Sequence, residues 1–117
     1  MTKAGQSIRL TLYWQATAEM ADDYSVFVHL VDGGSGVVAQ HDGQPLSGFY
    51  PTSFWDTGEI VRDEVDVAVG TSVPAGEYEL VAGMYLLGTG ERLPVLDKNG
   101  QTVGDTVSLG EVTVAER

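Results

Sequence analysis

The chain has 117 residues, of which 43% are hydrophobic and 20% charged, a balance typical of a globular domain rather than a disordered segment. Six basic and seventeen acidic residues give a formal net charge of −11, which disfavours binding to nucleic acid or to an anionic membrane surface. The absence of cysteine excludes disulfides and thiol chemistry.

No apolar run approaches the roughly 20 residues that a membrane-spanning helix needs, and the first ten residues lack the pattern of a signal peptide. We therefore expect no direct membrane insertion by this chain; a segment for export or anchoring would lie outside it. The sequence shows no internal repeat, linker or low-complexity tract. We expect one domain over residues 1–117, monomeric in isolation.

The first half of the chain reads as strands. Residues 8–14 alternate between apolar and polar, as a half-buried strand does, and residues 16–23 read as a loop. Residues 24–32 are apolar on both faces, which predicts a central strand covered on both sides. The glycine-rich residues 32–36 predict a hairpin connection to a partner strand over residues 37–42.

Residues 40–64 form the longest stretch without strand alternation, and four of the ten aromatic residues lie within seven positions of it. Its prolines and glycines predict a shaped loop. Residues 59–69 then alternate again, with four valines on one face and Asp63 in the same register. Because burying an unpaired carboxylate is costly, we expect backbone N–H groups of the preceding loop to bind Asp63.

The last third also reads as strands. Tyr78, just after a Pro-Ala-Gly turn, resembles the corner tyrosine of immunoglobulin-like domains, whose hydroxyl binds a neighbouring connection. Gly83 leaves a gap that we predict Trp55 fills. Residues 92–96 predict a short edge strand, and residues 97–100 a turn. The strand at 107–114 changes face at Gly110, which predicts a bulge.

These short strands, spaced about ten residues apart without helical periodicity, predict an all-β fold. The specific prediction is an antiparallel β-sandwich of seven to eight strands, immunoglobulin-like or carbohydrate-module-like. A small barrel is the alternative.

The residue types offer little for catalysis. The chain has no Gly-x-Ser-x-Gly motif, and its two histidines, His29 and His41, lie within or at the end of predicted strands. The many acidic pairs are expected by chance in so acidic a chain. We predict no enzymatic activity and no cofactor or metal; a calcium ion held by Asp42, Asp56, Asp63 and loop carbonyls is the alternative.

The aromatic stretch admits two interpretations. Exposed rings stack on sugar faces and neighbouring carboxylates accept hydroxyl hydrogen bonds, so the stretch can bind a glycan. Alternatively the rings fold inward and close one end of the domain, which the mixture of prolines and glycines favours. The candidate ligand-binding residues are Phe49, Tyr50, Phe54, Trp55, Asp42 and Asp63.

An ordered set of motifs covers nearly the whole chain. They are Leu12-x-Trp14, Tyr24-x-Val26-x-Val28-His29-Leu30, Gln40-x-Asp42-x-x-Pro45, Pro51-Thr52-x-x-Trp55-x-x-Gly58-Glu59-x-x-x-Asp63, Pro74-Ala75-Gly76-x-Tyr78-x-Leu80-x-x-Gly83-x-Tyr85 and Arg92-Leu93-Pro94. The set resembles a β-sandwich module at the C-terminal end of bacterial multi-pass membrane glycosyltransferases of the protein-mannosyltransferase type. The family has no catalytic motif in this module to carry over.

The resemblance implies an extracytoplasmic accessory domain of a larger membrane protein, which positions a glycan or polypeptide acceptor. Asp42, Thr52 and Asp63 would bind the loop's backbone donors, and Trp55 would anchor the loop. Our first hypothesis is therefore a non-catalytic accessory domain with weak glycan or acceptor binding. The alternative is a structural or protein–protein interaction module without a small ligand.

Overall fold

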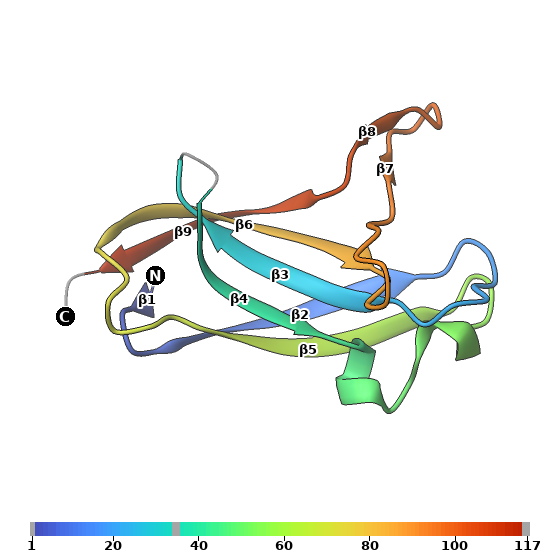
Figure 1. Cartoon of the computed structure of the whole chain (residues 1–117), viewed down its shortest axis with the longest axis horizontal. Coiled ribbons are helices and arrows are strands. Elements are labelled where there is room, and N and C mark those ends of the chain that lie inside the picture. Colours follow the sequence, from blue (N-terminus) through green and yellow to red (C-terminus); the bar gives the residue numbers. More distant parts are fainter. Residues whose placement is uncertain (1, 34–35, 116–117) are drawn as a thin grey trace.

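The computed structural model describes residues 2–33 and 36–115, and this part of the chain is all-β, with two short 3₁₀ helices and no α-helix (Figure 1). The elements are β1 (Thr2–Lys3), β2 (Ser7–Gln15), β3 (Ser25–Val31), β4 (Val37–Gly43), η1 (Pro45–Gly48), η2 (Thr52–Phe54), β5 (Ile60–Ala68), β6 (Gly76–Tyr85), β7 (Val95–Leu96), β8 (Thr102–Gly104) and β9 (Val107–Ala115). The prediction of an all-β fold is confirmed.

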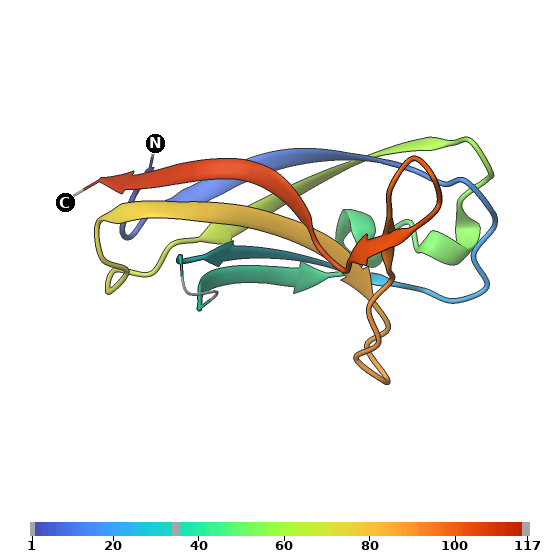
Figure 2. The same cartoon turned by 90° about the horizontal axis from the view of Figure 1, so that it is seen from above.

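The strands form three sheets. Sheet A has the order β1-β9-β6-β3-β4, sheet B pairs β2 with β5, and β7 pairs with β8 in a small hairpin. Sheet A is curled, and β2 and β5 lie across its concave side (Figures 1 and 2). The prediction of antiparallel pairing is wrong at one place, because the short β1 runs parallel to β9.

The hydrophobic core lies between sheets A and B. Alternating residues of β5 point inward, so Val61, Val65 and Val67 pack with Val28 and Leu80 of sheet A. The inward valines were predicted from the period of two, as was the inward position of Asp63. The core therefore follows from strand alternation on both sheets.

Strand β3 is central, as predicted, since it pairs with β4 on one side and β6 on the other. The predicted partner strand is β4; residues 34 and 35 of the predicted hairpin connection lie outside the described residues. The described part of the chain contains nine strands, rather than seven to eight, because β1 and β8 carry too few residues to show a pattern.

Two local predictions for β6 and β9 are confirmed. The Tyr78 hydroxyl donates a hydrogen bond to the Pro74 carbonyl oxygen at 2.7 Å, so it binds the turn that precedes β6. The pairing of β6 with β9 shifts register between Leu80 and Val81, whose partners are Gly110 and Ser108. Leu109 is the extra residue of this bulge, and Gly110 has a φ of 122°, which glycine adopts readily.

The gap at Gly83 is filled by Phe27, and the prediction that Trp55 fills it is wrong. Phe27 lies directly opposite Gly83 in the pairing of β3 with β6. A Cβ atom at Gly83 would lie 2.5 Å from the Phe27 ring and 2.8 Å from the Asp105 carbonyl oxygen. Glycine is therefore required here by a close approach, and the ring that causes it comes from the neighbouring strand.

Candidate functional site

The connection between β4 and β5, residues 44–59, is hereafter the aromatic loop. Its anchor is Trp55, whose side chain is 3% exposed and belongs to the core. The indole Nε1 donates a hydrogen bond to the Tyr50 carbonyl oxygen at 2.9 Å. Trp55 thus closes one end of the space between the sheets, and the inward interpretation of the aromatic stretch holds for this ring.

Phe49 and Phe54 face the solvent instead, with exposed fractions of 88% and 68%. The inward interpretation is therefore wrong for these two rings. Burial of apolar surface is the main gain of folding, so two exposed phenylalanines on one loop form a surface that a partner can cover. The aromatic loop divides its rings between an anchor and an exposed pair.

Tyr50 lies between these two environments and is half-buried. Its hydroxyl donates to the Glu59 carboxylate, whose two oxygens lie 2.8 and 2.9 Å away. This hydrogen bond raises the pKa of Tyr50. The same carboxylate accepts the Asp56 backbone N–H at 2.9 Å, so Glu59 closes the last turn of the aromatic loop before β5 begins.

Thr52 ties the aromatic loop to the segment before β3. Its side chain is fully buried; its hydroxyl donates to the Asp22 carbonyl oxygen at 2.7 Å and accepts the Tyr24 backbone N–H at 3.0 Å. The Asp23 carboxylate accepts the Ser53 backbone N–H at 3.0 Å. Two stretches about thirty residues apart in sequence are thereby held together.

Asp63 holds the other end of the aromatic loop. It is 2% exposed, and its Oδ1 accepts the Leu46 backbone N–H at 3.1 Å, which confirms the predicted role of the loop. Leu46 and Ser47 have φ values of 54° and 55°, in the left-handed region that is strained for non-glycine residues. The Asp63 Oδ2 is buried and has no hydrogen-bond partner within residues 2–33 and 36–115.

The structure brings Asp42 and Asp63 to one hollow, but none of the loop's four aromatic residues lines it. Asp42 lies opposite Phe27 in the pairing of β3 with β4, and it accepts a hydrogen bond from the Gln40 side chain at 2.6 Å rather than from the loop backbone. Within the described residues, no group of three or more His, Asp or Glu side chains is placed to hold a metal ion. The alternative of a calcium site on Asp42, Asp56 and Asp63 is not supported.

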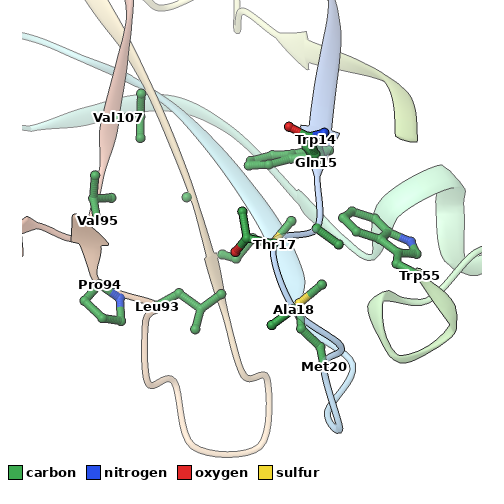
Figure 3. Close-up of a pocket in the computed structure, with 13 residues that line it drawn as sticks. Trp14, Gln15, Thr17, Ala18, Met20, Trp55, Leu93, Pro94, Val95 and Val107 are labelled. Carbon is green, nitrogen blue, oxygen red and sulfur yellow. The ribbon is translucent and has the colours of Figure 1, made fainter. Parts of the chain in front are cut away.

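A second feature near Trp55 was not predicted. A cavity of about 350 Å³ opens beside its ring, with Trp14 and Met20 on the same side and Leu93 and Val107 opposite (Figure 3). No charged side chain lines this cavity. Finding it from sequence needs the placement of β2 against the segment after β6, which no local pattern specifies.

The aromatic loop offers groups for hydrogen bonding and for ring stacking. Comparison of the chain with protein-family models, with curated proteins and with solved structures finds no match. The described part of the chain contains no helix long and apolar enough to cross a membrane. The site itself is therefore the basis for a functional proposal.

Proposed function

We propose that this chain is a non-catalytic β-sandwich module, immunoglobulin-like or carbohydrate-module-like, that binds a glycan weakly through the aromatic loop. The observation that carries the proposal is the exposure of Phe49 and Phe54 on a backbone fixed from several sides. Exposed rings on a fixed scaffold bind at low cost in conformational entropy. Tyr50 and Glu59 at the same loop supply polar groups for sugar hydroxyls.

The wider setting belongs to the same proposal. The motifs of the aromatic loop and of residues 74–85 resemble the accessory module of bacterial membrane glycosyltransferases, so we place the chain in an extracytoplasmic position, as a domain of a larger membrane protein. There it would hold a glycan or polypeptide acceptor near a transferase domain. No reaction step is assigned to this chain.

A protein partner is the second candidate, and exposed apolar side chains on sheet B favour it. Tyr13 and Ile60 are 68% and 64% exposed on adjacent strands, and Leu46 and Phe49 border Arg62 on β5. A surface of this kind, rich in apolar and aromatic side chains with an arginine, is typical of protein interfaces. In that case the module has a structural or protein–protein role and binds no small ligand.

An amide-resolved NMR titration separates the two candidates. The chain is titrated with methyl α-mannoside, cellotriose and chitotriose, with and without Ca²⁺, and we expect shifts at residues 49–59. The double variant Phe49→Ser, Phe54→Ser should lose them. The matched control is Leu87→Ser, which removes an apolar side chain, 76% exposed, from a different loop.

Absence of shifts at residues 49–59 with every sugar rejects glycan binding by the aromatic loop. The module would then be assigned to the structural or protein–protein role. Shifts at residues 49–59 that persist in the double variant also reject the aromatic loop as the site, because they show that its exposed rings are not needed.

A further inference from the structure

The outer face of sheet A, the side away from sheet B, carries a hollow of about 360 Å³ that the aromatic loop does not share. Phe27, His29, Asp42, Tyr85, Gly90 and Arg92 line it, and we call it the outer-face hollow. Its residues come from three neighbouring strands and from the turn after β6.

The register of β3 with β4 and β6 decides which residues line the outer-face hollow. Phe27 is almost fully buried and forms the floor, with Gly83 beside it on β6 and Asp42 beside it on β4. The His29 ring lies 4.8 Å from the Phe27 ring, and the Tyr85 ring lies 6.1 Å from it, both tilted. Three rings thus surround one point of the sheet surface.

The turn after β6 brings in Arg92. Gly90, with a φ of 75°, allows the chain to reverse, and Arg92 then pairs with Tyr85 in an isolated bridge. The guanidinium lies 4.4 Å from the centre of the Phe27 ring and 3.3 Å from the Asp105 carboxylate. A cation over an aromatic face and a paired carboxylate fix the direction of its remaining N–H groups.

The hollow therefore presents donors and acceptors around a ring surface. Arg92 is a donor only, with five N–H groups, and a carboxylate such as Asp42 has capacity for hydrogen bonds beyond the one from Gln40. Burial is the largest effect on the pKa of His29 and lowers it. The charges of both residues also affect this pKa: Asp42 raises it and Arg92 lowers it. Asp42 and Arg92 thus act on the same hollow.

From this geometry we infer that the outer-face hollow binds one ring of a neutral, hydroxyl-rich ligand, a sugar residue, between Asp42 and Arg92, with Tyr85 as the stacking surface. Each sugar hydroxyl both donates and accepts, so one ring can satisfy a carboxylate and a guanidinium together. An anionic ligand is disfavoured by Asp42, by the pairing of Arg92 with Asp105, and by the net charge of −11. This inference needs neither Phe49 nor Phe54, so it goes beyond the proposed function.

The test is an NMR titration of the full chain with methyl α-mannoside, cellotriose and chitotriose. We expect shifts at the amides of His29, Asp42, Tyr85 and Arg92 and at the His29 ring nitrogens. The same shifts should persist in the double variant Phe49→Ser, Phe54→Ser. Shifts restricted to residues 49–59 would overturn the inference and leave the proposed function standing. Shifts restricted to the outer-face hollow would support the inference and reject glycan binding by the aromatic loop. A silent spectrum rejects both.

Substitutions then test the named groups. Asp42→Asn should weaken sugar binding about tenfold, because hydrogen bonds to a charged group are among the stronger ones. Asp66→Asn is the matched control: it makes the same change in net charge at an exposed residue of β5, and binding should be unchanged. Equal affinity of Asp42→Asn and wild type would overturn the inference.

Tyr85→Ala should also weaken binding about tenfold, since it removes the stacking surface. Tyr85→Phe keeps the ring and should retain most of the affinity. Because Tyr85→Ala alters packing around Phe27, its amide spectrum is compared with that of wild type first. If it does not fold, Asp42→Asn decides the outcome.

Discussion

The aromatic loop and the outer-face hollow hold their side chains by different means. In the aromatic loop, an irregular backbone is fixed by hydrogen bonds from residues outside it, as when Asp63 accepts the Leu46 N–H and Asp22 accepts the Thr52 hydroxyl. In the outer-face hollow, regular pairing of β3 with its neighbours places Phe27 beside Gly83, and a cation–π contact places Arg92 above the Phe27 ring.

This difference determines how far a residue's environment follows from its position in the sequence. On a strand, neighbours point to opposite faces, so the environment of one residue predicts that of the next. In the aromatic loop no such rule applies. Phe54 is 68% exposed and Trp55 is 3% exposed, and only packing in the hydrophobic core decides which ring is buried.

The largest effect is expected where the aromatic loop enters the core. Trp55→Ala should lower the free energy of unfolding by about 3–5 kcal/mol, because it leaves a cavity between the sheets and removes the Nε1 hydrogen bond to Tyr50. Phe54→Ala, one residue away, should change it by no more than about 0.5 kcal/mol. Urea denaturation of both variants measures the contrast, and similar losses for the two would show that the loop's rings are not divided as described.

A smaller effect is expected at the floor of the outer-face hollow. Gly83→Ala should lower the free energy of unfolding by about 1–3 kcal/mol, since the new Cβ meets the Phe27 ring and the Asp105 carbonyl oxygen. Gly88→Ala is the matched control, because a Cβ at Gly88 meets nothing within 4 Å. Urea denaturation again provides the measurement. A Gly83→Ala variant as stable as wild type would mean that Phe27 moves aside freely.

The smallest effect concerns pH. Burial and the nearby Arg92 lower the pKa of His29 in the folded chain below its ordinary value of 6.5. Above pH 6.5 the imidazole is neutral in both the folded and the unfolded chain, so its titration does not change the stability. As the pH falls below it, the unfolded chain binds the proton first, so stability decreases until the folded pKa is also passed.

The comparison of wild type with His29→Gln isolates this contribution, because the carboxylates titrate in both proteins. The stability of wild type relative to His29→Gln should decline as the pH falls below 6.5, with a slope no steeper than about 1.4 kcal/mol per pH unit, the limit for one proton. Urea denaturation at several pH values supplies the data. A stability difference that is constant or grows as the pH falls would contradict the lowered pKa.

Much of the fold could be predicted because strand alternation is a local property. The inward valines of β5, the buried Asp63, the central position of β3, the Tyr78 hydroxyl and the bulge at Gly110 all follow from residues close in sequence. The short β1 and β8 could not, because two or three residues carry no periodic signal. Binding by the candidate ligand residues stays a prediction.

By itself, the sequence determined that this chain is all-β, and that Asp63 would draw backbone donors from the preceding loop, because an unpaired buried carboxylate is too costly. Only the tertiary structure decided that Trp55 points inward while Phe49 and Phe54 point outward, and that Phe27, rather than Trp55, covers Gly83. It also brought Arg92 from a distant turn onto Phe27. These outcomes depend on register and on contacts between segments far apart in the chain, which no local pattern encodes.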